Sequence, residues 1–390
     1  MSKTQKFKII IAIVMISFLQ GLQHSVTPVL GAIAETYPAV PTSFVQMLVS
    51  GPGLLAMVVA LISGVLVTKI SKKKLLLFAA AIGVLTGFLP LLIDSFWLLF
   101  VCRMIYGMTL GLAMCLNTAV VAEFFEGDER VQVMGIQGAS VGAGMMLVNL
   151  GAGMLGAGNF RNASWINLIA VLAFVLLLLF LPDTGKAQSD RREKIRLNRD
   201  VYIMAGIGFF FFMFLITFTT NISMHLAGNL AGSSRVSGIL TAAFSIIQIL
   251  MGIVLGAVTK ALKRFTMAAA LFSFTIGALL LVLFPSTFAW LLIGALFCGI
   301  CQGIMMPSGM VEVANAVNPL SQTMASAVFS CGVNLGSFLS PVFLNAAAKA
   351  VTGEATTGHV YLISAVGMAC LAAFSVLYQL KLKRGQTAGN

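Results

Sequence analysis

Long apolar stretches alternate along the chain with short segments that carry charged residues. A helix of about 20 apolar residues crosses the hydrocarbon of a bilayer. The region 9–68 is too long for one such helix and is broken near Pro38 and Pro41, and the region 265–311 is broken near Pro285. Further windows without any charge cover residues 75–93, 131–160, 162–182, 236–259 and 355–380.

The spacing of these windows predicts an all-α integral membrane protein with twelve transmembrane helices. Helices are placed between the breaks and the charged segments, since both interrupt an apolar span. The expected helices cover residues 9–33, 44–68, 75–93, 96–121, 131–156, 165–182, 201–224, 235–258, 265–284, 287–311, 323–347 and 360–380.

The first expected helix contains polar residues at an ordered spacing. In the stretch FLQGLQHSVTPVL, the residues Gln20, Gln23, His24 and Thr27 follow the pattern i, i+3, i+4, i+7. In an α-helix this pattern places all four on one face. Polar groups are costly in hydrocarbon and usually face a cavity or a partner, so we expect the stripe to line an aqueous path. The alternative is that it forms hydrogen bonds between helices.

Composition agrees with the membrane assignment and sets the orientation. Hydrophobic residues make up 59% of the chain and charged residues 9%, whereas an ordinary soluble domain is about 25% charged. With the N-terminus in the cytoplasm, 20 of the 24 lysines and arginines fall in cytoplasmic segments, as short loops require. We therefore expect a multi-pass protein of a bacterial plasma membrane with both termini inside. The net charge of +12 reflects this asymmetry and does not indicate a nucleic-acid partner.

The chain shows weak internal repetition. A shift of 196 residues places Cys102 on Cys298, and a shift of 194 places Gly138 on Gly332. Two similar halves in the same orientation are typical of secondary transporters, which bind substrate near mid-membrane between the halves. We expect two pseudo-symmetric six-helix bundles, at 1–182 and 201–390, joined by a cytoplasmic linker at 183–200.

Residues between the second and third helices resemble the loop signature of the major facilitator superfamily. The stretch GVLVTKISKKK begins at Gly64, with Thr68 where the family usually has aspartate and Ser71 where it usually has glycine. The resemblance covers essentially the whole chain and implies the family's twelve-helix fold. It also implies a gating loop, which consists of Gly64, Thr68, Lys69, Lys73 and Lys74. The alternative is that the lysines of this loop only set the topology of the protein in the membrane.

In the fourth helix, Arg103 with Tyr106 and Gly107 is similar to the family's arginine-containing signature. A guanidinium at this depth could bind a substrate anion through paired hydrogen bonds, or it could anchor neighbouring helices. Leu110, Met114 and Asn117 follow on the same helical face.

A substrate site is expected where helices 1, 4, 7 and 10 meet. The 196-residue shift carries the stripe of the first helix onto the seventh, where three of four positions are again polar, and the tenth helix offers an opposing face of Gln302, Met305, Met306 and Gly309. Methionines there would form an adaptable apolar wall, or pack ordinarily. The proposed substrate-binding residues are Gln20, Gln23, His24, Thr27, Arg103, Tyr106, Asn117, Thr219, Thr220, Ser223, Gln302 and Met306.

Two residues are candidates for carrying protons. His24 lies in the polar stripe, and its reference pKa near 6.5 allows it to change charge around neutral pH. Glu312 is the one remaining acidic candidate. It falls at the inner end of the tenth helix, where an interfacial position is the simpler interpretation.

No other motif indicates chemistry. The GxGxxG pattern at Gly151, Gly153 and Gly156 follows a helix rather than a strand, so a dinucleotide site is not expected. The six cysteines lie within expected helices without metal-ligand company. We therefore expect no enzyme activity, no cofactor and no metal.

The sequence predicts a monomeric secondary transporter that works by alternating access. Its resemblance to the drug:proton antiporter branch implies proton-coupled export of small amphipathic organic compounds. Two alternatives stay open: a proton-coupled symporter that imports a small organic anion, and a transport-inactive membrane sensor.

Overall fold

The computed structural model describes residues 3–186, 198–229, 234–317 and 322–387. Within these residues, twelve helical stretches are long and apolar enough to cross a membrane. Each of the twelve predicted spans overlaps one of them, which confirms the all-α membrane fold. Most of the predicted linker at 183–200 lies outside the described residues.

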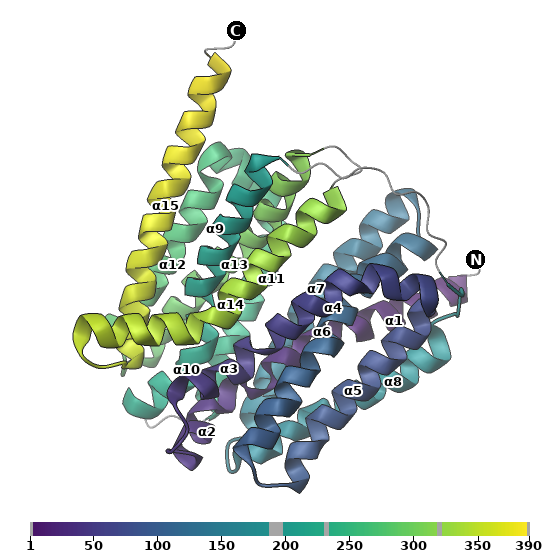
Figure 1. Ribbon diagram of the computed structural model, residues 1–390, viewed down its shortest axis with the longest axis horizontal. Coiled ribbons are helices and arrows are strands. Elements are labelled where there is room, and N and C mark those ends of the chain that lie inside the picture. Colours follow the sequence, from purple (N-terminus) through teal and green to yellow (C-terminus); the bar gives the residue numbers. More distant parts are fainter. Residues whose placement is uncertain (1–2, 187–197, 230–233, 318–321, 388–390) are drawn as a thin grey trace. The chain divides into compact units, whose positions relative to one another are not determined.

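The chain divides into two compact units. Unit 1 comprises Met1–Lys194 with Gly232–Ala242, and unit 2 comprises Ile195–Ala231 with Ala243–Asn390. The helix α11 (Ser234–Leu262) is shared between them. Figure 1 labels the helices of both units.

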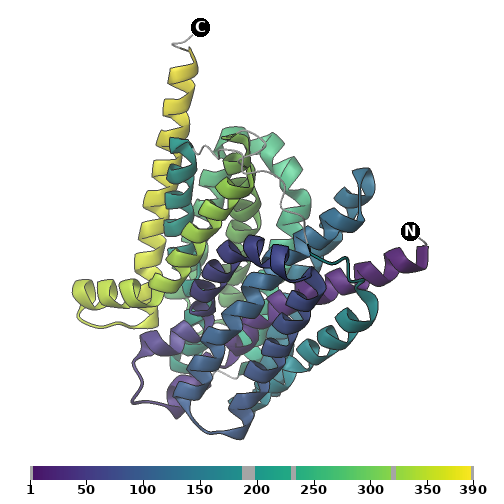
Figure 2. The ribbon, with the colours of Figure 1, turned by 45° about the vertical axis from the view of Figure 1, so that its right-hand side comes forward.

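Unit 1 contains the first six spans, in which α1, α5, α6, α7 and α8 surround a common apolar core. In Figure 2 these helices are the purple to teal ribbons. Its elements are α1 (Lys3–Gly21), η1 (Leu22–Val29), α2 (Leu30–Thr36), α3 (Thr42–Ser50), α4 (Pro52–Lys69), α5 (Lys72–Leu92), α6 (Phe96–Phe124), α7 (Gly127–Leu155), η2 (Phe160–Asn167) and α8 (Leu168–Phe180).

Unit 2 contains the last six spans apart from the beginning of α11. Within it α9 packs mainly on α14, and α12 packs on α13 and α15. Its elements are α9 (Arg199–Leu215), α10 (Thr217–Asn229), η3 (Lys263–Phe265), α12 (Thr266–Leu283), α13 (Phe288–Asn315), α14 (Gln322–Thr352) and α15 (Thr357–Thr387), besides most of α11.

Four of the spans, the first, second, sixth and seventh, consist of more than one helical segment, which the sequence pattern does not show. The first span changes from α-helix to a 3₁₀-helix at Leu22, and this segment includes Pro28. The seventh span is divided at Ile216, between α9 and α10, where the N–H of Ile216 still donates to the carbonyl of Phe212 and the N–H of Thr220 to the carbonyl of Ile216, both at 3.0 Å. Because proline lacks a backbone N–H and clashes with the preceding turn, Pro28 accounts for the irregular helix around it. The second segment of each span begins at positions 195 residues apart, Leu22 and Thr217, close to the offset of the sequence repeat.

Small residues allow close helix packing in unit 2. A Cβ atom added at Gly332 would collide with the backbone carbonyl of Ala205, and one at Gly336 with that of Phe209. The helices α9 and α14 therefore approach each other backbone to backbone, as small residues in membrane helices permit. Gly138, the repeat partner of Gly332, differs: an added Cβ meets no atom within 4 Å. Gly138 therefore does not make the close helix contact that its repeat partner makes.

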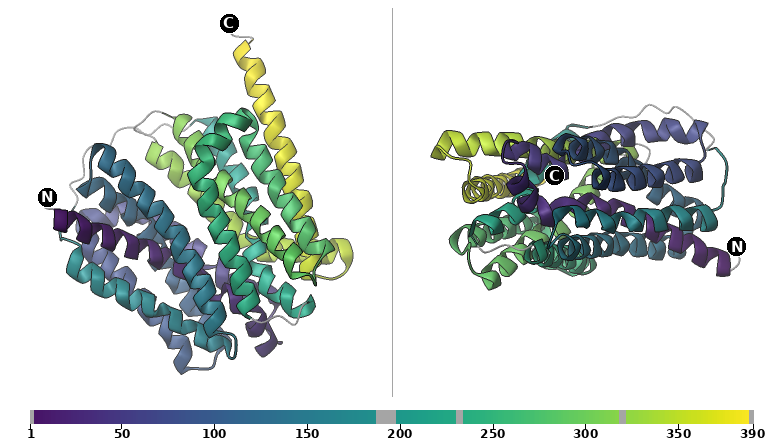
Figure 3. Two further views of the ribbon diagram at one scale, coloured as in Figure 1. Left: turned by 180° about the vertical axis from the view of Figure 1, so that it is seen from behind. Right: turned by 90° about the horizontal axis from the view of Figure 1, so that it is seen from below.

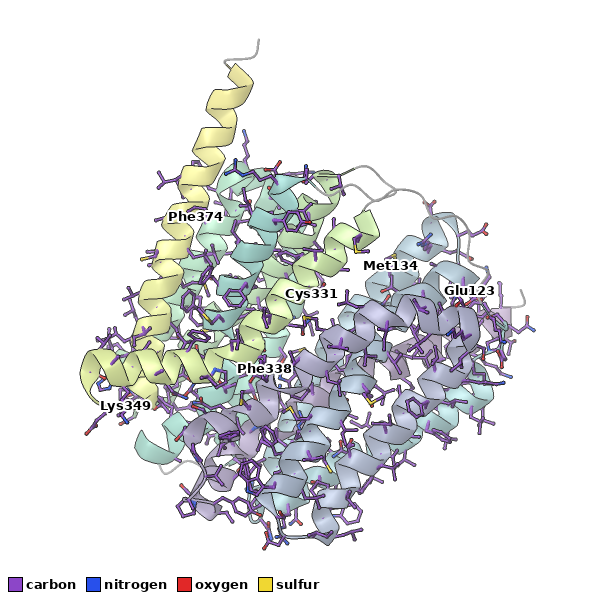
Figure 4. The ribbon with its side chains drawn as sticks, viewed as in Figure 1. Glu123, Met134, Cys331, Phe338, Lys349 and Phe374 are labelled. Atoms are coloured by element: carbon purple, nitrogen blue, oxygen red, sulfur yellow. The ribbon has the colours of Figure 1, made fainter. Side chains whose placement is uncertain are left out.

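The last two helices of unit 2, α14 and α15, differ from the others in course and length. The helix α14 bends, with Pro341 inside it, and its last part runs across the end of α15 (Figure 1). Lys349 lies on this crossing part (Figure 4). The helix α15 continues well past the other helices of unit 2 toward the C-terminus (Figure 3), beyond the apolar stretch that ends at Leu377.

Candidate functional site

Arg103 is the centre of a buried hydrogen-bond network in unit 1. Its side chain lies on α6 and is only 5% exposed. Its Nε group donates to the carbonyl of Leu48 at 2.9 Å. One terminal nitrogen donates to the carbonyl of Leu22 at 3.5 Å and to Ser25 Oγ at 3.4 Å, and the other donates to the carbonyl of Gln23. The guanidinium therefore joins α6 to α3 and to the 3₁₀ segment η1.

The irregular helix explains why these carbonyls are available. The change from α-helix to 3₁₀-helix at Leu22 alters the regular pattern of backbone hydrogen bonds, and a buried carbonyl without a partner is costly. Arg103 supplies N–H groups to Leu22 and Gln23, and Tyr106 donates its hydroxyl to the carbonyl of Leu19. The Arg103 guanidinium also lies 5.2 Å from the centre of the Tyr106 ring, within the range of a cation–π contact.

The polar stripe of the first span does not form the continuous α-helical face that its spacing predicted. Gln23, His24 and Thr27 all lie in η1, and a 3₁₀-helix has three residues per turn instead of 3.6. The prediction of one α-helical face is therefore wrong. His24 and Thr27 are buried, and His24 Nδ1 and Thr27 Oγ1 have no hydrogen-bond partner among the described residues.

The two glutamines of the stripe bind neighbouring helices in unit 1. Gln20 Nε2 donates to the carbonyl of Ala113 in α6 at 3.4 Å. Gln23 Nε2 donates to the carbonyl of Val49 in α3 at 3.3 Å. Both side chains remain partly exposed.

The remaining residues of the predicted face on the fourth span differ in how far they are buried. Leu110 and Asn117 are buried, whereas Met114 is 40% exposed. Asn117 Nδ2 donates to Ser17 Oγ at 2.9 Å, and Ser17 in turn donates to the carbonyl of Ile13 at 3.1 Å. Asn117 therefore ties α6 to α1.

In unit 2 the counterpart residues lie just after the break in the seventh span. Thr219 and Thr220 are buried and donate to the carbonyl of Ile216 at 3.1 and 3.0 Å. Their hydroxyls therefore cover the carbonyl at the break itself. Ser223 lies one turn further on and is also buried.

The tenth span presents Gln302 and Met306 on α13, where both are partly exposed. Met305 is fully buried, and a Cβ added at Gly309 would meet the ring of Phe329 in α14. The predicted four-residue face is therefore wrong for Met305 and Gly309, which pack inside unit 2. Glu312 is exposed near the end of α13, as an interfacial residue would be.

The predicted gating loop is fastened to other helices of unit 1. Lys72 forms an ion pair with Glu123 of α6 at 2.9 Å, and Figure 4 marks Glu123 near the N-terminal end of that unit. Lys73 donates to the carbonyl of Leu178 in α8 at 2.8 Å. Thr68 donates only to the carbonyl of Val65 one turn earlier, at 2.8 Å. Gly64, Lys69 and Lys74 are exposed.

One buried histidine was missed by the sequence analysis. His225 lies on α10 and is 2% exposed. Its Nε2 lies 3.1 Å from the carbonyl of Leu281 in α12, and its Nδ1 lies 2.8 Å from Thr357 Oγ1 at the start of α15. A carbonyl only accepts, so Nε2 carries the hydrogen and Nδ1 of the neutral ring accepts from Thr357. A histidine within an apolar span was the available signal.

A narrow cleft opens within unit 1. It is lined by residues of η1, α2, α5, α6 and η2, and it reaches Arg103 and Tyr106. At its rim Arg161 forms an ion pair with Asp94, which also accepts a hydrogen bond of 2.5 Å from the Tyr37 hydroxyl. The described residues contain no cluster of three or more histidine, cysteine or acidic side chains suited to a metal ion.

Comparisons with known proteins agree on one family. The sequence profile of the Major Facilitator Superfamily matches residues 9–222 and again 204–388. No curated protein sequence matches the chain. Among solved structures, the nucleoside transporter NupG is 16% identical with a TM-score of 0.77, covering 95% of this chain and 99% of that one.

Two further structures show the same fold. A bacterial homologue of the human lysosomal transporter Spinster is 15% identical with a TM-score of 0.71 and covers 97% of this chain and 96% of its own. The human organic anion transporter MFSD10 is 15% identical with a TM-score of 0.68, and the alignment covers 96% of this chain and 100% of the MFSD10 chain.

Proposed function

The chain belongs to the major facilitator superfamily, and on this premise we propose that it is a proton-coupled secondary transporter that exports small amphipathic organic molecules. Transport would proceed by alternating access, with the two halves moving about a site that both contribute to. The proposed halves are residues 1–182 and 201–390, joined through 183–200, with both termini in the cytoplasm and the protein acting as a monomer.

The observation that carries this proposal is the pair of matching breaks in the first and seventh spans. Transporters commonly bind substrate where membrane helices are discontinuous, because irregular backbone in a membrane must line a cavity or be buried in protein. Here the segments that follow the two breaks begin at Leu22 and Thr217. The proposed substrate groups lie beside them, with Gln20 and Gln23 in one unit and Thr219 and Thr220 in the other.

The surroundings of Arg103 favour an uncharged substrate over an organic anion. Its nitrogens already donate to three backbone carbonyls and one hydroxyl, so a carboxylate would have to displace at least one of these acceptors to form the paired hydrogen bonds that it prefers. Amides, hydroxyls and methionine thioethers make up the proposed lining, and these groups suit a molecule with polar and apolar parts. Nucleosides, the cargo named for NupG, are molecules of this kind.

Proton coupling is assigned to His24. It is buried in η1 with no hydrogen-bond partner for Nδ1 among the described residues, and it lies next to Gln23 and Ser25, which both accept from Arg103. A proton on His24 would therefore interact directly with the network that holds the break. Glu312 is the secondary candidate.

A pH gradient across liposomes tests the proposal. The reconstituted protein is given an acidic interior or an acidic exterior, and accumulation is followed for a labelled nucleoside, an amphipathic fluorescent dye and a labelled carboxylate. An antiporter moves substrate against the proton flow, so the dye or nucleoside should accumulate on the acidic side whichever way the protein is inserted. Accumulation on the alkaline side indicates a symporter instead, and binding without flux indicates a sensor.

The His24→Gln variant separates coupling from transport itself. It should lose accumulation driven by the pH gradient and retain exchange of labelled for unlabelled substrate at equal pH. Gln137→Ala, on α7 and outside the proposed site, is the matched control. Unchanged pH-driven accumulation in His24→Gln would remove His24 from the coupling step.

A further inference from the structure

Arg103 carries a buried positive charge for which the structure shows no carboxylate. The ion pairs among the described residues join Lys6 to Glu129, Lys72 to Glu123 and Arg161 to Asp94. The acceptors around Arg103 are neutral carbonyls and the Ser25 hydroxyl. Among the described residues, these four hydrogen bonds leave one of the five guanidinium N–H groups for a further acceptor. Neutral dipoles do not cancel the net charge of the side chain.

An uncancelled charge inside a membrane span is costly. Charged side chains in such spans are usually paired with an opposite charge or face a water-filled cavity, and buried charges in proteins are generally paired. Arg103 does reach a cavity, since it lines the cleft of unit 1. The cleft therefore connects the buried cation to a space that a counter-ion can enter.

The floor of the cleft offers a donor besides the guanidinium. Ser25 lines the cleft and uses its oxygen to accept from Arg103 at 3.4 Å. The hydrogen of its hydroxyl is therefore available to donate to a ligand. Tyr106 and Asn167 line the same space, but Tyr106 donates to Leu19, and Asn167 donates to Gly87 and Ser164.

The rim of the cleft adds a second arginine. Arg161 lines the cleft, and its partner Asp94 is 65% exposed and also accepts from Tyr37. The lining of the cleft thus includes two guanidinium groups, and the Asp94 carboxylate beside it is paired with Arg161. The cleft as a whole carries a net positive charge.

We propose that unit 1 holds a small inorganic anion of the size of chloride in this cleft, between Arg103 and Ser25, with Arg161 attracting it at the rim. The cavity there has room for only a few water molecules. That size suits a halide better than a larger organic carboxylate. The proposed site lies within unit 1 and shares Arg103 with the substrate site expected from the sequence.

Thermal unfolding of the purified protein tests this site. The melting temperature is measured at constant ionic strength while sodium gluconate is replaced by sodium chloride, bromide or acetate. A ligand of the folded state raises the melting temperature as its concentration passes its dissociation constant. We expect saturable stabilisation by chloride and bromide, none by gluconate, and at least about threefold weaker binding for Ser25→Ala. Preferential stabilisation by acetate would assign the site to carboxylates and overturn the proposal.

Two variants at the rim give effects of opposite sign. Asp94→Asn removes the competing carboxylate and should strengthen chloride binding about two- to fivefold, whereas Arg161→Gln should weaken it by a similar factor. A purely structural role for the Arg161–Asp94 pair predicts a lower melting temperature in both variants with no change in chloride affinity. That result would contradict the proposal.

The broadening of the chloride-35 resonance supplies a measurement that does not rely on stability. Specific binding should broaden the signal of the wild-type protein, and bromide should remove the excess broadening. Lys349→Ala, on the exposed part of α14 in unit 2, is the control for general electrostatic attraction. Equal broadening in Ser25→Ala, Arg161→Gln and wild type would show an adventitious ion only.

Discussion

The Nε group of Arg103 donates a 2.9 Å hydrogen bond to the backbone carbonyl of Leu48. This contact joins the fourth span to the second, and the same guanidinium also holds the 3₁₀ segment of the first span. One side chain thus fixes the position of three helices around the irregular part of unit 1. A planar group with several donors is suited to this, because its N–H directions are set in advance.

Arg103→Lys should destabilise the protein even though it keeps the charge. A lysine ammonium reaches fewer of the carbonyls at Leu48, Leu22 and Gln23 in the required geometry, and buried carbonyls without partners cost about 1–3 kcal/mol each. We expect a loss of about 2 kcal/mol or more in unfolding free energy, measured by denaturant titration in mixed micelles. Arg161→Lys at the rim of the cleft, where the side chain is partly exposed, is the control and should lose less than about 1 kcal/mol.

Two glycines related by the sequence repeat should respond differently to alanine. Gly332→Ala brings a Cβ onto the carbonyl of Ala205 and should cost about 1–3 kcal/mol of stability, because the helices must separate. Gly138→Ala meets no atom within 4 Å and should be neutral or stabilising by up to about 1 kcal/mol. Thermal unfolding of both variants checks this. Equal destabilisation would contradict the difference in packing.

The contact between His225 and Thr357 should stabilise unit 2. Thr357→Val keeps the shape but removes the hydroxyl that pairs with Nδ1 at 2.8 Å, and hydrogen bonds between membrane helices average about 0.6 kcal/mol with a maximum near 1.7. We expect a loss in this range, seen as faster amide exchange in α10. Thr357→Ser retains the hydroxyl and should behave as wild type. Similar exchange in both variants would exclude a role for this bond.

The carboxylate of Asp183 should titrate at unusually low pH. The backbone N–H of Gly185 donates to it at 3.1 Å and holds its pKa below the ordinary value, with Lys74 and Lys73 acting in the same direction. Because the pKa is lowered in the folded state, the stabilisation is complete above the ordinary value near 3.9. It is lost as pH falls through the lowered value.

Carbon-13 NMR of labelled aspartate measures this pKa directly in lipid nanodiscs. Lys74→Gln should raise the pKa of Asp183 toward its ordinary value. Gly185→Ala should raise it as well, since Gly185 has φ of 80°, a conformation that alanine rarely adopts. A pKa unaffected by both changes would show that these contacts do not form in the membrane.

The sequence determined the number of spans. Hydrocarbon thickness sets the length of an apolar helix, and this is a local property that the charge-free windows and the prolines at 38, 41 and 285 reveal. The repeat offset likewise located equivalent positions in the two halves. The profile match over 9–222 and 204–388 agrees with the resemblance found in the loop after Gly64 and around Arg103.

Tertiary structure decided what the polar residues do. The prediction of one polar face assumed a continuous α-helix through Gln20, Gln23, His24 and Thr27, whereas the chain changes to 3₁₀ geometry at Leu22. The carbonyls near this change accept hydrogen bonds from side chains of α6. The partner of a buried donor depends on which helices pack beside it. For the same reason, the repeat could not distinguish Gly138 from Gly332, and nothing in the sequence joined His225 to Thr357, which lies 132 residues away.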